Sequence, residues 1–175
     1  MVSTVITLRR ARPEDAAEIA ETHDCAWREA YRGVIPGREL ERMIARRGPR
    51  WWRSAILRGA SIAVVDFDES IAGYVSYGRN RMPALDSGGE IFELYLAPEF
   101  QGLGFGRRLF DAARRDLAAH GFDSFIVWAL VDNERAVAFY ERMGGQATHR
   151  TQERFGAARL ERIGFAFRAA GANPD

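Results

Sequence analysis

One segment dictates the architecture, and it reads Leu94-Tyr95-Leu96-Ala97-Pro98-Glu99-Phe100-Gln101-Gly102-Leu103-Gly104-Phe105-Gly106-Arg107-Arg108. An apolar strand ends before Pro98, and a helix begins near Phe105 after a turn with glycines at alternate positions. Glycine lets backbone N–H groups approach an anion, and a helix N-terminus adds unsatisfied donors and the positive end of a dipole. The segment therefore predicts a cradle for a diphosphate, to which Arg107 and Arg108 add charge.

Two other phosphate-binding motifs share this strand–glycine–helix order, and the sequence fits neither. The dinucleotide fingerprint needs Gly-x-Gly-x-x-Gly and an acid at the end of the next strand, but here that strand ends Trp128-Ala129-Leu130. The nucleotide phosphate loop needs a lysine, and all 25 basic residues of this chain are arginines. Schiff-base chemistry is excluded by the same lack of lysine. A tight turn that simply requires glycine is the purely structural alternative.

Hydrophobic periodicity on either side of this segment predicts alternating strands and helices. We expect strands at 4–9, 61–67, 71–77, 90–96, 122–130, 146–155 and 159–167. We expect helices at 13–31, in a second stretch interrupted at Gly48-Pro49, at 105–120 and at 133–143. The unit 90–130 makes one parallel crossover. The sequence thus predicts an α+β fold, a mixed and mostly antiparallel sheet of about seven strands flanked by about four helices.

Length and composition set the class of protein. The 175 residues fit a single domain, which we place over 1–175 with its core at about 4–168 and a disordered tail at 169–175. The formal charge of +1 carries no basic excess, so we expect neither a nucleic-acid nor a membrane partner.

The cysteine and histidine residues of the chain indicate whether it contains a disulfide or a metal site. Cys25 is the single cysteine, and the three histidines (His23, His120 and His149) show no ligand spacing, so we expect no disulfide and no metal site. The N-terminus has no apolar signal region, and the longest apolar run, 125–131, is far shorter than a membrane span. We expect a cytoplasmic protein.

Two motifs, in this order, resemble those of the GNAT superfamily of acyl-CoA-dependent N-acyltransferases. The coenzyme motif of that family reads Gln/Arg-x-x-Gly-x-Gly/Ala, and the run Gln101 to Gly106 fits at every fixed position. The second motif is an Asn, apolar residues, Phe-Tyr and a Gly after the helix, matched here by Asn133, Phe139-Tyr140 and Gly144. The likeness is strong over about 89–145, and the element order extends it to roughly 4–168.

The resemblance implies acetyl-CoA as co-substrate and no metal, and it assigns residues to the coenzyme. Backbone groups of Leu94, Tyr95 and Leu96 would pair with the pantetheine arm as an added strand does. Asn133 would hydrogen-bond to the same arm. The diphosphate would be held by backbone amides of Gln101, Gly102, Leu103, Gly104, Phe105, Gly106 and Arg107.

The resemblance also implies the reaction, which is direct attack of an amine on the thioester carbonyl. The Tyr140 hydroxyl would protonate the leaving thiolate, and a strand amide near Leu94 would stabilise the oxyanion. Taken without the resemblance, Tyr140 reads as a core aromatic that shares a helix stripe with Val137 and Met143.

The amine must lose a proton, so a general base is required, and Glu93 and Glu90 are the candidates. On a regular strand, residues three apart face opposite sides, but a bulge would change that. We favour Glu93, with Glu90, water or another group as alternatives. Some family members carry a glutamate base five residues before the Asn, where this chain has Trp128.

The acceptor would bind beside the first two helices. Trp27 and Tyr31 lie four apart on one helix face and predict an aromatic pocket near Gly33 to Gly37, although core packing or a dimer surface fits them equally. Trp51 and Trp52 lie in the same region. Between Arg81 and Arg107 the chain has no basic residue and four acids, which fit a cationic amine. These acids are Asp86, Glu90, Glu93 and Glu99.

We therefore predict an enzyme, an acetyl-CoA-dependent N-acetyltransferase, acting on a primary amine of a small molecule or, as the second choice, of a peptide. A homodimer is expected because the family often dimerises. The alternative is a catalytically weak coenzyme-A-binding sensor or interaction module. A third possibility, a nucleotide-binding protein, predicts affinity for ATP or NAD and none for coenzyme A.

Overall fold

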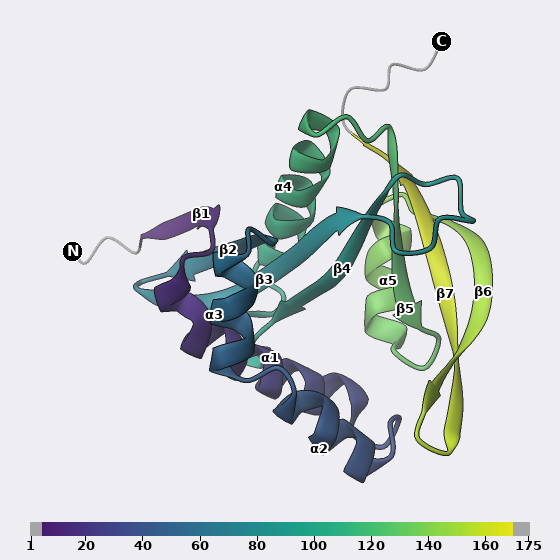
Figure 1. The fold of residues 1–175 in the computed structure, drawn as a ribbon, viewed down its shortest axis with the longest axis horizontal. Coiled ribbons are helices and arrows are strands. Elements are labelled where there is room, and N and C mark those ends of the chain that lie inside the picture. The colour runs from purple at the N-terminus through teal and green to yellow at the C-terminus, as the bar shows by residue number, and fades with distance from the viewer. Residues whose placement is uncertain (1–4, 170–175) are drawn as a thin grey trace.

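A seven-stranded sheet in the order β1-β2-β3-β4-β5-β7-β6 forms the centre of the protein, whose computed structural model describes residues 5–169 (Figure 1). β4 and β5 are parallel, and every other neighbouring pair is antiparallel. The predicted mixed, mostly antiparallel sheet is thus confirmed. The strands are β1 (Ile6–Arg10), β2 (Ser61–Phe67), β3 (Ser70–Arg79), β4 (Gly89–Leu96), β5 (Ser124–Leu130), β6 (Gln146–Phe155) and β7 (Ala158–Arg168).

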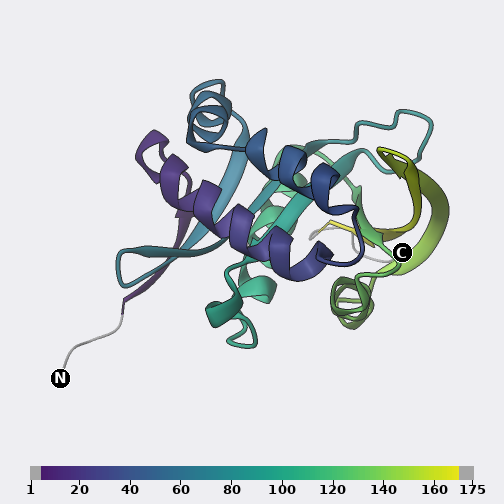
Figure 2. The ribbon, with the colours of Figure 1, turned by 90° about the horizontal axis from the view of Figure 1, so that it is seen from below.

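Helices cover both faces of the sheet (Figure 2). Within residues 5–169 they are α1 (Ala16–Tyr31), α2 (Gly37–Ala45), α3 (Pro49–Leu57), α4 (Phe105–Ala119) and α5 (Glu134–Arg142). The second predicted helical stretch is two separate helices, because Pro49 has no N–H to continue a helix and instead begins α3. α1 and α3 pack on one face, while α4 and α5 pack on the other.

Each face has its own apolar core. On the α4 side, Phe110 packs against Phe125 and Phe167, whose rings stack with centroids 5.1 Å apart. On the α1 side, Trp52 and Tyr74 are fully buried and meet edge to face at 4.8 Å. Burying a large apolar side chain stabilises a fold by about 1.5–3 kcal/mol, so the two cores hold the sheet and its helices in fixed relation.

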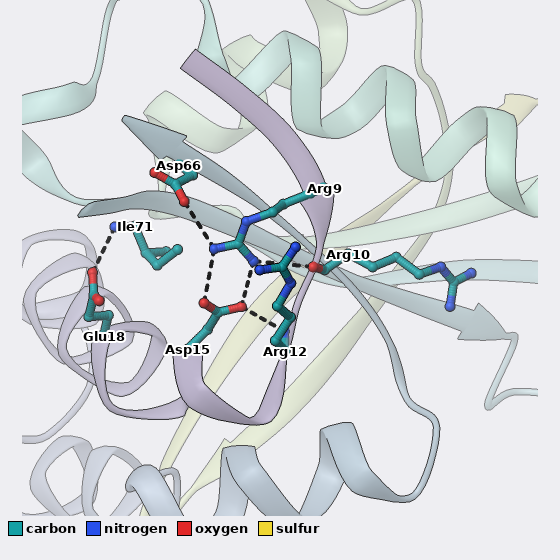
Figure 3. Close-up of polar contacts among 7 residues, drawn as sticks. All are labelled: Arg9, Arg10, Arg12, Asp15, Glu18, Asp66 and Ile71. Atoms are coloured by element: carbon teal, nitrogen blue, oxygen red, sulfur yellow. Dashed lines mark hydrogen bonds and ion pairs between the residues drawn. The ribbon is translucent and has the colours of Figure 1, made fainter. Parts of the chain in front are cut away.

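The start of α1 is fastened to three strands by ion pairs and hydrogen bonds (Figure 3). Arg9 on β1 donates to both oxygens of Asp15, at 2.7 and 3.0 Å, and to Asp66 on β2 at 3.0 Å. Glu18 of α1 accepts a hydrogen bond from the N–H of Ile71 on β3 at 2.9 Å. These contacts fix the orientation of α1 on the sheet.

β4 departs from regular pairing in two places, and both shape the site. Its register against β3 shifts between Ser76, which faces Glu93, and Tyr77, which faces Ile91, so that Phe92 is the extra residue of a bulge. Its parallel ladder with β5 includes only residues 89–91, after which the two strands diverge (Figure 1). The remainder of β4 therefore has no strand partner on its β5 side.

The chain ends differ slightly from expectation. Residue 4 of the predicted first strand and residues 170–175 of the predicted tail lie outside the described part of the chain. Ala169, which we expected to be disordered, is instead buried, and its N–H donates to the Asp123 carbonyl at 2.9 Å. No helix of residues 5–169 is long and apolar enough to cross a membrane.

Candidate active site

A cavity of about 660 Å³ lies on the face of the sheet that α1 and α3 cover, and β3, β4, β5 and the β6–β7 hairpin complete its walls. Trp27 and Tyr31, the predicted acceptor residues, both line it, and so do Trp51 and Trp52. The tip of the hairpin closes against α2, where a Cβ on Gly156 would come within 2.8 Å of the Glu39 side chain. The two aromatic residues thus line a cavity, but of the loop 33–37 beside which the pocket was predicted only Ile35 contributes to its wall.

The bulge in β4 brings both candidate bases to this cavity. Glu90 and Glu93 line it together, although residues three apart on a regular strand face opposite sides. The extra residue, Phe92, also lines the cavity, whereas Ile91 and Leu94 pack into the core beneath α4. A local irregularity of one residue thus decides which carboxylates reach the acceptor side.

Glu90 is fully engaged by a single partner. Its side chain is 3% exposed, and Arg81 donates to it from Nη2 at 2.6 Å, from Nε at 3.2 Å and from its backbone N–H at 3.0 Å. A guanidinium fork and a backbone amide engage both oxygens of this carboxylate, so Glu90 forms a structural ion pair with Arg81.

Glu93 has fewer partners. Its side chain is 9% exposed, and its one guanidinium contact is a long one of 3.5 Å, from Arg47 Nη1 to Oε2. Burial raises the pKa of Glu93, although the charges of Arg47 and Arg81 and a hydrogen bond from the Tyr74 hydroxyl oppose the rise. A carboxylate with a raised pKa and a free oxygen is suited to accept a proton near neutral pH.

The Tyr74 hydroxyl connects this carboxylate to a buried histidine. Tyr74 is fully buried, and its oxygen lies 2.7 Å from His23 Nδ1. Burial, and secondarily the charge of Arg47, lowers the pKa of His23 to about 3, so the imidazole is neutral at working pH. His23 therefore positions the Tyr74 hydroxyl beside Glu93 and carries no charge of its own.

This buried histidine makes the fold sensitive to acid. The unfolded chain binds a proton near the ordinary pKa of 6.5, while the folded chain resists protonation down to about 3, so stability is complete above 6.5 and falls through that window. Between about pH 7 and about pH 5 the loss attributable to His23 should be about 2 kcal/mol.

Urea titrations at several pH values measure this loss. His23→Gln should remove that part of the pH dependence, whereas His120→Gln, at the exposed end of α4, should retain it. An unchanged slope of stability against pH in the His23 variant would contradict the assignment.

Tyr140 on α5 presents a free hydroxyl. The residue is 6% exposed, and no side chain or backbone group of the described chain hydrogen-bonds to its oxygen. Burial, together with the neighbouring Tyr31, raises the pKa of Tyr140, so it is protonated at neutral pH and has a proton to give. The Tyr31 hydroxyl is itself 2.7 Å from that of Tyr95 on β4.

Asn133 begins α5, and its side chain accepts a hydrogen bond from the Ala136 N–H at 3.2 Å. Such an N-cap stabilises a helix by about 1 kcal/mol, so Asn133 sets the position from which Tyr140 projects. Its amide also lies beside the Tyr31 hydroxyl.

The glycine turn has the geometry of an anion cradle. Gly102 and Gly104 have φ of 78° and 81°, and a Cβ at either would meet no atom within 4 Å, so the space beside the backbone is open. Backbone N–H groups of residues 104–107 have no acceptor in the described chain. Gly106 packs beside α5, where a Cβ would make an ordinary contact with the Phe139 ring at 3.4 Å.

Gln101 and Arg107 flank this turn in different ways. The Gln101 N–H already donates to the Pro98 carbonyl at 3.3 Å, and its side chain donates to Glu29 of α1 at 2.9 Å, so it braces the turn. Arg107 is exposed, and its one ion pair, from Nε to Asp111 Oδ2, is long at 3.8 Å, so this contact does not restrain the side chain. Its guanidinium is free to reach a phosphate.

The electrostatic expectation for the acceptor site was wrong. Asp86 and Glu99 are exposed and lie outside the cavity, and the two remaining acids are paired with arginines. The third acid of the lining, Glu153, pairs with Arg162 at 3.2 Å. The cavity is lined by four arginines and three glutamates, so its balance is positive; the arginines are Arg47, Arg58, Arg81 and Arg162.

Comparison with known proteins agrees with this arrangement. The family model described as "Acetyltransferase (GNAT) family" matches residues 19–145. An uncharacterized N-acetyltransferase of Bacillus subtilis, YuaI, is 30% identical over 160 residues, which cover 91% of each chain. These matches include the glycine turn, both candidate bases and Tyr140.

Solved structures share the fold. The PaiA N-acetyltransferase of Thermoplasma acidophilum, solved in complex with coenzyme A, superposes with a TM-score of 0.73 at 18% identity, covering 90% of this chain and 98% of that one. YncA of Salmonella typhimurium, a putative acetyltransferase solved with acetyl-CoA, gives 0.69 at 19% identity and covers 98% of each chain. From its fold, its two motifs and these matches, the chain belongs to the GNAT family and is an N-acetyltransferase.

Proposed function

We propose that the protein transfers the acetyl group of acetyl-CoA to a primary amine of a small molecule, with a peptide amine as the second choice. The proposal is carried by the arrangement at the end of β4, where an unpaired strand edge adjoins the free N–H groups of α4. The PaiA and YncA structures contain coenzyme A and acetyl-CoA, which supports the same ligand here.

The coenzyme would lie where β4 and β5 diverge. Its pantetheine arm would pair with the free edge of Leu94, Tyr95 and Leu96, as an added strand does. Its diphosphate would accept hydrogen bonds from the backbone of residues 102–107 and charge from Arg107. Gln101 and Asn133 would act by bracing the turn and α5.

Glu93 would act as the general base, on the cavity side of β4. It would take a proton from the acceptor ammonium, after which the neutral amine attacks the thioester carbonyl. Tyr31 is close enough to sense both groups electrostatically: besides its burial, the charge of Glu93 raises the pKa of Tyr31, and Tyr31 adds to the rise in the pKa of Tyr140 caused by burial.

Tyr140 would then give its proton to the departing thiolate, and a β4 amide near Leu94 would donate to the oxyanion. Glu90 would hold Arg81 in the cavity wall. This division of roles follows from the partners of the two carboxylates, three short bonds for Glu90 and one long contact for Glu93.

The glycine turn provides the test of coenzyme binding. Gly104→Ala should weaken acetyl-CoA binding about 10-fold or more in a calorimetric titration, because a methyl group would enter the cradle at a positive φ. Gly121→Ala is the matched control, since Gly121 has a φ of 83° and equally open surroundings at the other end of α4.

Both variants carry the same backbone strain, which costs about 1 kcal/mol of stability, so only the first should change affinity. Equal affinities in the two variants, or tighter binding of ATP or NAD than of acetyl-CoA by the wild type, would remove the coenzyme assignment. Binding of acetyl-CoA without thiol release for any amine would favour the sensor module.

The proposal includes the remaining expectations about assembly and location. These are a single domain spanning the chain, a homodimer and a place in the cytoplasm. Light scattering measures the first two through the mass and compactness of the particle, and fractionation of cells measures the third.

A further inference from the structure

One arginine in the cavity has its charge next to the candidate base. Arg47 lies between α2 and α3 with its guanidinium 3.9 Å above the ring of Trp51, and its Nη1 is 3.5 Å from Glu93 Oε2. No other side-chain hydrogen bond is made by Arg47 within residues 5–169. A guanidinium has five N–H donors, so four of those of Arg47 have no acceptor within residues 5–169, and the side chain, 31% exposed, helps to line the cavity.

The other arginines of the lining are committed elsewhere. Arg81 makes three hydrogen bonds to Glu90, and Arg162 pairs with Glu153 while it stacks 4.4 Å above the Trp128 ring. Arg58 is exposed and hydrogen-bonds to Ser54. Arg47 is thus the arginine whose sole acidic partner is the base itself, and its charge is unbalanced once that base takes up a proton.

This arrangement disfavours a simple cationic amine. An ammonium group placed against Glu93 would also lie beside the Arg47 guanidinium, and the two like charges would repel each other. A carboxylate on the carbon that bears the amine would cancel the repulsion and accept two parallel hydrogen bonds from the free fork of Arg47. In an α-amino acid the nitrogen and the carboxylate oxygens are about 3 Å apart, which matches the 3.5 Å between the two protein groups.

Aromatic side chains also contribute to the wall of the cavity. Trp27, Trp52, Phe92 and Trp128 line it, and its volume of about 660 Å³ exceeds what an amine alone would fill. We propose that the acceptor is a free α-amino acid with a large apolar or aromatic side chain, whose ammonium binds Glu93 and whose carboxylate binds Arg47. The inference rests on the proposed function and names its substrate class.

The reaction then balances as follows. The amino acid ammonium gives one proton to Glu93, and its nitrogen forms a bond to the thioester carbonyl carbon. The carbon–sulfur bond breaks as the nitrogen loses its second proton to water, and the thiolate takes a proton from Tyr140. Tyr140 then regains a proton from water, and Glu93 releases the proton that it took up. The products are an N-acetyl amino acid, coenzyme A and one proton released to solvent.

Three acceptors that differ only at the carboxylate test the inference. L-Tryptophan, L-tryptophan amide and tryptamine are compared by thiol release at saturating acetyl-CoA, with kcat/KM expressed per free amine. We expect L-tryptophan to exceed each of the others at least 10-fold. The amide stands for a peptide N-terminus, so a preference for it would replace the free amino acid with a peptide acceptor and overturn the inference.

Variants of Arg47 separate the binding of the substrate carboxylate from any effect that Arg47 has on the basicity of Glu93. Arg47→Gln should reduce the preference for L-tryptophan over tryptamine to about 1, and Arg47→Lys, which keeps the charge and loses the fork, should leave an intermediate preference. Any change in the basicity of Glu93 affects both acceptors alike and cancels in this ratio. Arg46→Gln, on the exposed side of the same turn, is the control and should keep the wild-type ratio.

The outcomes distinguish this inference from the proposed function. Calorimetric binding of acetyl-CoA with turnover of tryptamine equal to that of L-tryptophan would overturn the amino acid acceptor and leave the acetyltransferase role standing. If acetyl-CoA binds but none of the three compounds is acetylated, the amino acid acceptor is likewise overturned and the acetyltransferase role stands. Absence of acetyl-CoA binding would remove the proposed function itself.

Discussion

Replacing Glu93 with glutamine should lower kcat/KM for the acceptor by about 100-fold or more near neutral pH, because an amide cannot take the proton from the acceptor ammonium. Glutamine keeps the shape of the side chain and a partner for the Tyr74 hydroxyl. Acetyl-CoA affinity and the unfolding midpoint should therefore remain close to those of the wild type.

The pH dependence of this variant identifies the base. Burial raises the pKa of Glu93 above the ordinary value of 4.5, so the wild-type kcat/KM should fall on the acid side of a midpoint above that value. In Glu93→Gln that acid limb should disappear. The deficit should also shrink at alkaline pH, where the free amine is abundant without a base.

Glu153→Gln is the matched control, since Glu153 lines the same cavity and is paired with Arg162. Glu90→Gln should chiefly reduce stability, because it removes the buried carboxylate that accepts three hydrogen bonds from Arg81. A 100-fold loss of activity in Glu90→Gln with full activity in Glu93→Gln would reverse the two roles.

Removing the hydroxyl of Tyr140 should lower kcat about 100-fold with little change in acetyl-CoA affinity, because the leaving thiolate loses its proton donor. Tyr140→Phe leaves no partner unsatisfied, since no group in residues 5–169 hydrogen-bonds to this hydroxyl. The unfolding free energy should stay at or slightly above the wild-type value.

Tyr77→Phe should give the opposite pattern. The Tyr77 hydroxyl donates to Asp116 on α4 at 2.8 Å, so its removal should cost about 1 kcal/mol of stability and leave kcat unchanged. Activity measured by thiol release and stability measured by urea unfolding separate the two variants. If Tyr140→Phe loses stability and keeps kcat, then Tyr140 is a core residue and not the acid.

The arrangement of strands could be read from the sequence because each element carries its own local signal. Glycines at 102 and 104 adopt a positive φ, Pro49 begins a helix, and Gly156 marks the turn between the last two strands. These are properties of neighbouring residues and need no knowledge of the rest of the chain. The fold, the glycine turn and the family followed from them.

The roles of the side chains in the cavity depended on segments far apart in the sequence. The bulge at Phe92 is set by pairing with β3, and it alone places Glu90 and Glu93 on one face, where the sequence left that outcome open. Arg47 and Tyr74 have no motif around them, yet the packing of α2, α3 and β3 brings both to Glu93.

The sequence by itself thus determined the order of the elements, the glycine turn and the family, since short-range backbone preferences specify them. Only the tertiary structure decided the balance of charge in the acceptor site. Counting acids in and around β4 predicted a site for a cation, but arginines from the α2–α3 turn, the end of α3, β7 and the loop after β3 converge on the same cavity and reverse its sign. Electrostatic interactions depend on distance through space, and distance along the chain does not reveal them.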